Sequence, residues 1–371
     1  MRKVLVTGSK GFIGKNLMVA LLRQENVKVA GFDADDDVSI LREGLKDVGI
    51  IYHLAGVNRP EKVEEFETGH AGFTQQMLSL LSEQDRKPAI VLSSSIQAEL
   101  DNPYGVSKKK AEDLLFDYSK NTGAPVFIHR LPNVFGKWCR PNYNSVVATF
   151  CYNVAHDLPI TISDRERLME LVYIDDVIAS FLDILHNSER RLSDKYLSVR
   201  PAYKIKLGEL ADRIYQLRDI RKTLVVPDLK ESFMKCLYAT YLSYLEKDDF
   251  SYPLDLKTDN RGSLAEVIKS EHFGQIFVSK SHADIIRGSH YHDTKVEKFC
   301  VIKGRAVIKL RHILENKVLS YHVSGDKIEI VDIPPGYTHS IENLSDEEMI
   351  VLFWSDQIFN SEKPDTYQNE V

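Results

Sequence analysis

The chain has 371 residues, 43% of them hydrophobic, and a formal net charge of −6 at pH 7. Because one hydrophobic core rarely serves more than about 250–300 residues, this length predicts two globular domains. The negative net charge, without a long block of Lys or Arg, argues against a nucleic-acid partner, since a phosphate backbone is bound through concentrated positive charge.

The N-terminal part alternates short β-branched runs with stretches of helical periodicity. Strands are expected at residues 3–8, 27–33, 50–56 and 88–95, and the first helix at 14–24. This alternation predicts a Rossmann-like α/β domain, with a doubly wound parallel sheet covered on both faces. Helical spacing with many aromatic residues over about 206–247 predicts the closing helices of this domain, which is expected to span residues 1–246.

A glycine-rich turn joins the first strand to the first helix. The segment VLVTGSKGFIGKNL places Gly8, Gly11 and Gly14 there, with Phe12 and Ile13 between them. Such glycines allow a tight turn, close approach of the backbone to a pyrophosphate, and close packing of helix on strand. The segment therefore predicts a dinucleotide site, against the alternative that the glycines serve only the turn.

The second strand ends at Asp33, where a carboxylate can accept hydrogen bonds from the adenosine ribose. A carboxylate at this point repels the additional phosphate of NADP, so the local chemistry favours NAD. The competing interpretation is that Asp33, Asp35, Asp36 and Asp37 form a solvated loop.

A Tyr–Lys pair follows the fourth predicted strand. Tyr104 and Lys108 are four residues apart at the start of a predicted helix, so their side chains share one face. An ammonium one turn away favours the phenolate and lowers the pKa of a tyrosine, which makes it a usable acid or base. Ser95, with Ser94 as second choice, is expected to polarise a substrate carbonyl. The alternative is an ordinary surface pair on a helix.

These motifs together resemble the extended short-chain dehydrogenase/reductase (SDR) family. The pattern TGxxGFxG, a Ser-rich strand end, YxxxK and RxxNVxG correspond to residues 7–14, 93–95, 104–108 and 130–136. The resemblance implies a nucleotide-sugar substrate with Asn133 near its phosphates or sugar, and a cofactor lined by Leu54, Ala55 and Gly56. Arg59 is then a candidate substrate contact. The loop between Ser95 and Tyr104 is shorter than in the family pattern.

From about Phe250 the pattern changes to short alternating runs separated by turns. Strands are expected at residues 274–281, 297–304, 305–313, 317–324 and 326–336. They predict an antiparallel β-domain over residues 247–371.

Four potential metal ligands lie in this β-domain: His290, His292, Glu297 and His339. On a strand, His-x-His directs both imidazoles to one side, and three imidazoles with one carboxylate suit zinc, iron, manganese or nickel. The patterns H-x-H-x4-E-x6-G and P-x-G-x2-H-x3-N resemble the two cupin motifs, ending here at Gly304 and Asn343. The resemblance implies a metal-binding jelly roll, the alternative being a metal-free sugar-binding cupin. The isolated His282, His312 and His322 are expected to be structural or on the surface.

The order of an extended SDR followed by a cupin resembles, over the whole chain, the bifunctional capsular-polysaccharide enzymes of the CapF type. YATYLSYL at 238–245 and NRGSLAEV at 260–267 belong to this resemblance. It implies that the cupin epimerises C3 of a UDP-4-keto-6-deoxy-N-acetylhexosamine. The SDR domain then reduces the C4 ketone to give UDP-2-acetamido-2,6-dideoxy-L-talose, a precursor of N-acetyl-L-fucosamine. It also implies zinc and NADPH, with NADH kept as an alternative because of Asp33.

Three alternatives stay open. The chain can be a reductase with a regulatory or dimerising cupin, an SDR that epimerises or dehydrates with tightly bound NAD, or a non-catalytic nucleotide-sugar sensor. If the cupin is an epimerase, Tyr291, Lys298 and Tyr337 are the proton carriers that the sequence offers near the metal.

No segment is apolar for long enough to span a bilayer, and the N-terminal apolar run is interrupted by Gly, Ser and Lys. The four cysteines, Cys139, Cys151, Cys236 and Cys300, form no CxxC pair and are expected to be reduced thiols. We therefore expect a cytoplasmic protein without a membrane partner. Because cupins commonly pair through their strands, we also expect a homodimer.

Overall fold

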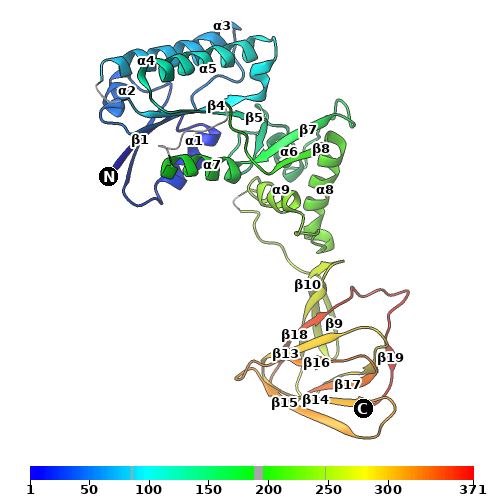
Figure 1. The fold of residues 1–371 in the computed structure, drawn as a ribbon. Coiled ribbons are helices and arrows are strands. Elements are labelled where there is room, and N and C mark those ends of the chain that lie inside the picture. Colours follow the sequence, from blue (N-terminus) through cyan, green and yellow to red (C-terminus); the bar gives the residue numbers. More distant parts are fainter. Residues whose placement is uncertain (85–86, 188–194, 247) are drawn as a thin grey trace. The chain divides into compact units, whose positions relative to one another are not determined.

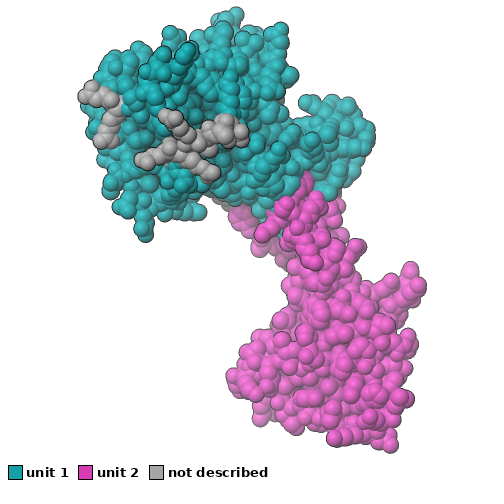
Figure 2. All heavy atoms as spheres, viewed as in Figure 1, with its two compact units in different colours: residues 1–215, 236–245 teal, residues 216–235, 246–371 magenta. Residues whose placement is uncertain are grey.

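The computed structural model describes residues 1–84, 87–187, 195–246 and 248–371. These form two compact units, one of residues 1–215 with 236–245 and one of residues 216–235 with 246–371 (Figure 2). The chain therefore passes between the units at three points, and residues 216–235 group with the second unit. Residue 247, the first of the second domain expected from sequence, lies outside the described residues.

The first unit is built on a five-stranded parallel sheet with the strand order β2-β1-β3-β4-β5 (Figure 1). Its strands are β1 Arg2–Thr7, β2 Val27–Phe32, β3 Ile50–His53, β4 Ala89–Ser95 and β5 Val126–Leu131. The order reverses between β1 and β3, and the carboxyl ends of strands at such a switch point form the crevice where α/β sheets bind ligands.

Helices cover both faces of this sheet, which confirms the doubly wound architecture. Alternate residues of β1 enter different cores, because successive side chains of a strand point to opposite faces. Val4 and Val6 join the core under one helix pair, and Leu5 joins the core under three other helices. The pair is α1 Phe12–Leu21 and α7 Ile174–Asn187, and the other three are α2 Val38–Leu45, α4 Phe73–Ser82 and α5 Pro103–Thr122.

Smaller elements complete the first unit. A three-stranded sheet consists of β6 Asn133–Phe135, β7 Leu168–Tyr173 and β8 Ala202–Lys206. Short helical segments are α3 Glu64–Glu67, a π-helix at Thr68–Gly72, a 3-10 helix at Ile96–Glu99, and α6 Val146–Ala155. Two helices follow at the expected positions, α8 Leu207–Thr223 and α9 Ser232–Leu242, and each has one part in the first unit and one part in the second. After α9, the Tyr244 hydroxyl donates a 2.7 Å hydrogen bond to the carbonyl of Cys139.

The second unit contains two antiparallel sheets, ordered β16-β13-β18-β11-β10-β9 and β15-β14-β17-β12-β19. Their strands are β9 Leu256–Asp259, β10 Gly262–Ser270, β11 Gly274–Ser281, β12 Ile286–Tyr291, β13 Glu297–Lys303, β14 Arg305–His312, β15 Val318–Ser324, β16 Val331–Ile333, β17 Tyr337–Asn343, β18 Met349–Ser355 and β19 Tyr367–Gln368. Phe299, Val301 and Phe353 of the first sheet share one buried cluster with Ile308 and Ile341 of the second. The sheets thus enclose a common core, and the predicted antiparallel β-region is confirmed.

Within the described part of the chain, no helix has both the length and the apolar character needed to cross a bilayer.

Candidate active site and metal centre

The glycine turn between β1 and α1 has the compactness that its sequence predicts. Gly8 adopts φ +72°, and a Cβ there would lie 2.7 Å from the backbone nitrogen of Ala55. A Cβ on Gly14 would lie 2.0 Å from the carbonyl oxygen of Gly8. Larger residues at either position would therefore force the turn away from the strand ends. Gly11 is the N-cap of α1, so the positive end of the helix dipole lies at this turn.

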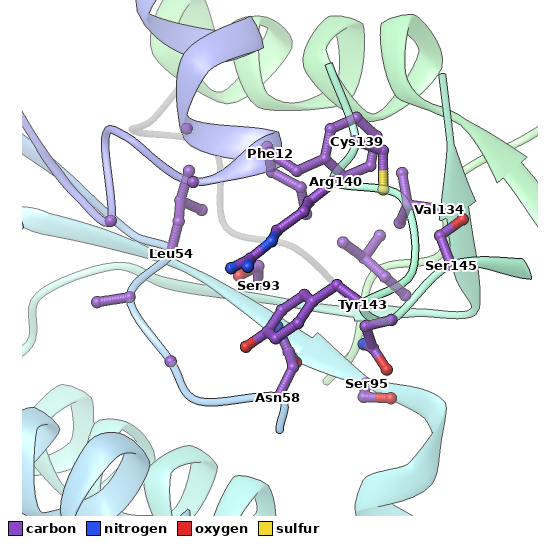
Figure 3. A pocket seen from close by; sticks show the side chains of 18 of the residues that line it. Phe12, Leu54, Asn58, Ser93, Ser95, Val134, Cys139, Arg140, Tyr143 and Ser145 are labelled. Carbon is purple, nitrogen blue, oxygen red and sulfur yellow. The ribbon is translucent and has the colours of Figure 1, made fainter. Parts of the chain in front are cut away.

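A cavity of about 810 Å³ opens beside the turn (Figure 3). Its lining includes nearly all the cofactor, catalytic and substrate residues predicted for this unit, namely Gly8, Gly11, Phe12, Ile13, Gly14, Asp33, Leu54, Ala55, Gly56, Ser95, Tyr104, Lys108 and Asn133. Arg59 is the exception. The chain bends at Asn58 and Arg59, and both residues are exposed, but Asn58 lines the cavity and Arg59 does not.

Helix α5 carries the Tyr–Lys pair to the cavity wall. The side chain of Asn102 caps the helix by accepting a 2.8 Å hydrogen bond from the backbone N–H of Gly105. Tyr104 in the first turn lines the cavity together with Ser95 at the end of β4. One turn later, Lys108 Nζ donates to the carbonyl of Ser93 at 3.3 Å. Tyr104, Lys108 and Ser95 are therefore assembled at one place.

The hydroxyl of Ser94, the second choice for polarising the carbonyl, makes a structural hydrogen bond instead. It donates a 2.6 Å hydrogen bond to Glu112, whose carboxylate also holds Arg130 through bonds of 2.9 and 2.7 Å. Arg130 opens the RLPNVFG motif, and in the structure it joins β5 to α5 beneath the site. Asn133 of the same motif reaches the cavity instead, and its Nδ2 donates to the carbonyl of Glu170 at 3.3 Å.

Burial dominates the electrostatics of the Tyr–Lys pair. It lowers the pKa of Lys108 to about 8, although the charge of Glu112 acts in the opposite direction. Burial also raises the pKa of Tyr104, against the lowering effect of the Ser95 hydroxyl. The pKa of Tyr104 thus moves opposite to the direction predicted from the Tyr–Lys spacing, because burial is the largest effect.

Asp33 is held by donors of the glycine turn. Its carboxylate accepts hydrogen bonds from the backbone N–H of Lys10 at 3.0 and 3.1 Å and from the hydroxyl of Ser9. Lys10 also pairs with Asp35 at 2.8 Å. Asp33 is therefore a built part of the cavity wall rather than a member of a freely solvated loop. The same site offers the carboxylate of Asp33, which suits the ribose hydroxyls of NAD, and the ammonium of Lys10, which suits the additional phosphate of NADP.

The segment after β6 supplies lining residues that motif reasoning missed. These are Trp138, Cys139, Arg140, Tyr143, Asn144 and Ser145. The side chains of Arg140 and Tyr143 extend into the cavity (Figure 3), and the guanidinium carbon of Arg140 lies 5.1 Å from the centroid of the Tyr143 ring. A guanidinium in such a wall suits a phosphate group. The only available signal was a basic and polar run, KWCRPNYN, directly after the RLPNVFG motif.

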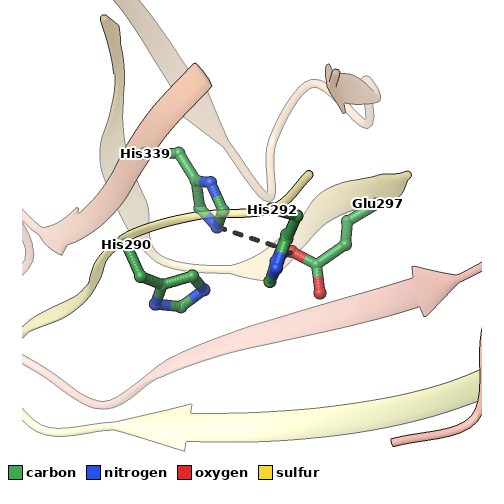
Figure 4. Close-up of side chains that lie close together, drawn as sticks. All are labelled: His290, His292, Glu297 and His339. Carbon is green, nitrogen blue, oxygen red and sulfur yellow. Dashed lines mark ion pairs between the residues drawn. The ribbon is translucent and has the colours of Figure 1, made fainter. Parts of the chain in front are cut away.

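The four predicted metal ligands converge inside the second unit (Figure 4). One ligand atom from each of His290, His292, Glu297 and His339 lies within 4.8 Å of the others. His290 on β12 is paired in register with His339 on β17, next to a bulge at Gly288–Ser289. Glu297 begins β13 and faces inward like Phe299 and Val301, two and four residues later.

The tautomers of two ligands fit a metal ion. Nδ1 of His292 contacts the carbonyl of Asp365, and Nδ1 of His339 lies 3.3 Å from the carbonyl of Tyr337. Because a carbonyl only accepts, each Nδ1 carries the proton and each Nε2 presents its lone pair to the cluster. These buried Nε2 atoms lie 3.2 and 3.4 Å from one Glu297 oxygen, and neither makes a well-formed hydrogen bond with a described residue. Nitrogen and oxygen donors so arranged suit a divalent transition metal.

The protonation states also fit a metal. Burial, with the neighbouring imidazoles, lowers the pKa of His290 to about 4, so this ligand is neutral at pH 7. Burial raises the pKa of Glu297, but the two adjacent imidazoles, His292 and His339, outweigh burial and hold the value at about 2, so this ligand is ionised at pH 7. Metal binding requires this combination of neutral imidazole and ionised carboxylate.

Of the three proposed proton carriers, Tyr337 lies on the strand face that also carries His339. Lys298 points away from the cluster, because it alternates with Glu297 along β13, and it pairs with Asp332. Tyr291 stacks on Tyr367 with ring centroids 5.2 Å apart. The geometry therefore favours Tyr337 over the other two.

Comparison with known proteins covers both units. Residues 4–197 match the NAD dependent epimerase/dehydratase family, and residues 257–367 match the Polysaccharide biosynthesis C-terminal domain. The UDP-2-acetamido-2,6-beta-L-arabino-hexul-4-ose reductase of Pseudomonas aeruginosa is 44% identical over 370 residues, which is 100% of this chain and 99% of the relative.

Solved structures give the same picture. The capsular polysaccharide assembling protein CapF from Staphylococcus aureus matches with a TM-score of 0.93 and 44% identity, over 99% of this chain and 100% of that one. The UDP-glucuronic acid 4-epimerase from Bacillus cereus, in complex with NAD, matches 65% of this chain and 98% of its own, with a TM-score of 0.56 and 21% identity. This second match supports the fold alone.

Proposed function

The chain belongs to the NAD dependent epimerase/dehydratase family, and from this premise we propose that it is a bifunctional nucleotide-sugar enzyme of the CapF type. Its second unit epimerises C3 of a UDP-4-keto-6-deoxy-N-acetylhexosamine. Its first unit then reduces the C4 ketone of the epimerised sugar. The product is UDP-2-acetamido-2,6-dideoxy-L-talose, used in capsule or O-antigen synthesis. The observation that carries the proposal is the convergence of Tyr104, Ser95 and Lys108 on the cavity beside the glycine turn.

In the reductase step, the side chains of this cavity handle the proton and the substrate. The ketone oxygen accepts hydrogen bonds from the hydroxyls of Tyr104 and Ser95, and Tyr104 gives up its proton as the oxygen becomes a hydroxyl. Lys108 provides positive charge beside the phenol, which stabilises the tyrosinate left behind. When bound, NADPH or NADH supplies the hydride that reaches C4.

The lining after β6 supports a UDP-sugar as the substrate. Arg140 extends into the cavity as a donor for the diphosphate, and Asn133 and Asn144 supply amides for the sugar or phosphates. The name of the P. aeruginosa relative describes the reduction of a UDP-linked 4-ulose, at 44% identity over the whole chain.

We propose that the second unit is a cupin that binds zinc through His290, His292, Glu297 and His339. The proton at C3 is acidic because it lies beside the C4 ketone, so it can leave through an enolate and return on the opposite face. When bound, the metal supplies positive charge for the enolate oxygen or fixes the strands that carry the acid and base. Tyr337 is the first candidate for one of the two proton carriers. Epimerisation must precede reduction, because the reduced sugar no longer acidifies C3.

A homodimer in the cytoplasm completes the proposal. Cupins commonly associate through their strands, and a closed symmetric pair is the commonest oligomer. Light scattering of the purified full chain tests this directly, since a mass near one chain would exclude the dimer.

The experiment incubates the protein with UDP-4-keto-6-deoxy-N-acetylhexosamine in deuterated water, first without cofactor and then with NADPH or NADH. C3 is followed by NMR and the cofactor by absorbance. Deuterium at C3 before cofactor is added, followed by cofactor oxidation, supports both steps and identifies the preferred dinucleotide. Reduction without prior exchange means that the second unit is not an epimerase. If neither exchange nor reduction occurs, the proposed substrate is wrong.

A further inference from the structure

A buried histidine lies behind the reductase cavity without lining it. His70 sits in the π-helix Thr68–Gly72, between α3 and α4, and is 2% exposed. A π-turn is costly inside a helix and occurs frequently at functional sites. In the mechanism above, His70 has no part.

Its ring connects the cofactor loop to helix α5. Nε2 of His70 accepts a 3.1 Å hydrogen bond from the backbone N–H of Val57, and Nδ1 lies 2.8 Å from the hydroxyl oxygen of Ser107. Ser107 in turn donates its own hydroxyl proton to the carbonyl of Tyr104 at 2.8 Å. Val57 follows the cofactor-lining residues 54–56, and Ser107 directly precedes Lys108.

These partners determine the tautomer of the ring. The N–H of Val57 can only donate, so Nε2 of His70 is unprotonated. The single proton of Ser107 is committed to Tyr104, so Nδ1 of His70 must be the donor to Ser107. A neutral imidazole with its proton on Nδ1 is the one form that satisfies all three hydrogen bonds. A protonated ring would lose the bond from Val57.

A second histidine ties the same π-helix to the ends of two strands. Thr74 donates to the carbonyl of His70 at 2.7 Å, and its oxygen lies 2.9 Å from Nε2 of His53. Nδ1 of His53 lies 2.8 Å from the hydroxyl of Thr7, at the start of the glycine turn. The hydrogen-bond chain Thr7, His53, Thr74 and His70 therefore runs from β1 through β3 to the π-helix.

This series of hydrogen bonds ends at His70, close to the catalytic groups. A Cβ on Gly56 would be 2.8 Å from the His70 ring and 3.3 Å from Lys108 Nζ, so these three residues meet at one point. The rings of His70 and Tyr104 make an edge contact with centroids 5.5 Å apart. Burial, then the charge of Lys108, lowers the pKa of His70 to about 3, which agrees with the neutral ring that the geometry requires.

We propose that His70 is a positioning residue of the reductase site, a neutral imidazole that fixes the spacing between the cofactor loop 54–58 and the helix that carries Tyr104 and Lys108. The inference rests on the proposed function for its catalytic readout. It assigns no contact with substrate to His70. It explains why a π-turn is present at this place, since the turn presents the ring between the loop and α5.

The test compares two serines of the same unit, each in contact with a buried histidine. Ser107→Ala removes the acceptor of His70, and Ser180→Ala removes the partner of His129, which lies 2.9 Å from the Ser180 hydroxyl and outside the cavity lining. For each variant the kcat, the KM for the UDP-sugar, the Kd for NADPH from fluorescence, the pH profile and the unfolding midpoint are measured. Ser107→Thr, which keeps the hydroxyl, serves as the rescue.

We expect Ser107→Ala to weaken NADPH binding and lower kcat on the order of 10- to 100-fold with little change in the KM for the UDP-sugar, and to shift the pH profile. Ser180→Ala should change the unfolding midpoint only, and Ser107→Thr should recover most of the loss. Equal effects of the two alanine variants on Kd, kcat and pH profile would overturn the inference. If the wild type binds NADPH but oxidises none with the substrate, the proposed function fails. In that case NADPH binding by itself tests the positioning role of His70, and an unchanged Kd in Ser107→Ala overturns that role.

Discussion

Nε2 of His292 lies 3.2 Å from an Oε2 oxygen of Glu297 in the second unit. The same oxygen is 3.4 Å from Nε2 of His339, so two imidazoles and one carboxylate converge on one point with their other ring nitrogens bound to backbone carbonyls. This arrangement leaves the lone pairs of three side chains facing one another. A divalent cation between them is the simplest way to satisfy all three.

His290→Ala is therefore expected to release the metal. The purified wild type should contain about one zinc per chain, measured by elemental analysis, and the variant less than about a tenth of that, because three remaining ligands hold zinc far more weakly. His322→Ala is the matched control, since His322 is exposed on β15. If zinc stays with the His290 variant, the ligand set is wrong.

Asp365 is expected to support the metal site indirectly. Its carboxylate accepts hydrogen bonds from the backbone N–H groups of Asp293, Thr294 and Lys295 at 3.0, 3.0 and 2.9 Å, while its carbonyl contacts His292. Asp365→Ala should free this turn and weaken zinc binding about 10-fold, as is usual for groups that orient a ligand. Competition with a chelator measures the affinity. Asp346→Ala, at an exposed position, should have no effect, and equal affinities in both variants would contradict the role of Asp365.

The Glu112–Arg130 pair is expected to stabilise the first unit. The Glu112 side chain is fully buried and binds Arg130 through two hydrogen bonds. Glu112→Gln therefore leaves a nearly buried guanidinium whose remaining charged partner, among the residues that the structure describes, is the exposed Glu99. We expect a loss of about 3 kcal/mol in the free energy of unfolding. Glu99→Gln should cost less than about 1 kcal/mol, because Glu99 is 72% exposed. Urea titration followed by Trp138 fluorescence, with Trp354 replaced by Phe, checks both values.

Reduction is expected to depend on the charge of Lys108. Burial lowers its pKa to about 8, so the side chain is an ammonium below that pH and becomes neutral as the pH rises through it. The kcat/KM for reduction should then fall above about pH 8. Lys108→Arg keeps a positive charge across this range, because a guanidinium does not lose its proton there. The kcat/KM of this variant should stay constant across this pH range, even if it is lower. If the variant shows the same alkaline decline as the wild type, the decline belongs to the titration of another group.

Several features could be predicted from the sequence because their pattern is local. Val4, Leu5 and Val6 form a continuous apolar run, which is typical of a parallel strand buried on both faces, and the structure places them in two cores. The ligands His290 and His292 could be grouped because residues two apart on a strand direct their side chains to one side, whereas His339 is indicated by the resemblance to the second cupin motif. The glycine turn could be found because its spacing reflects a steric need at Gly8 and Gly14.

Other features depend on contacts that no spacing encodes. Arg140 and Tyr143 lie in an irregular segment shaped by positive φ angles at Trp138 and Asn142, 70° and 54°, so no periodicity reveals that they face the cavity. The place of Arg59 after the cofactor segment predicts a substrate contact, but the side chain is exposed and does not line the cavity. The pKa direction of Tyr104 follows from burial, which is a property of the folded unit.

The most direct test of two separate active sites is C3 deuterium exchange by Tyr104→Phe, in deuterated water with the UDP-4-keto sugar and without cofactor. The variant should exchange C3 at close to the wild-type rate, and on addition of NADPH it should oxidise none, because only the phenol of the first unit is missing. Loss of exchange together with loss of cofactor oxidation would contradict the account, since both reactions would then depend on one site.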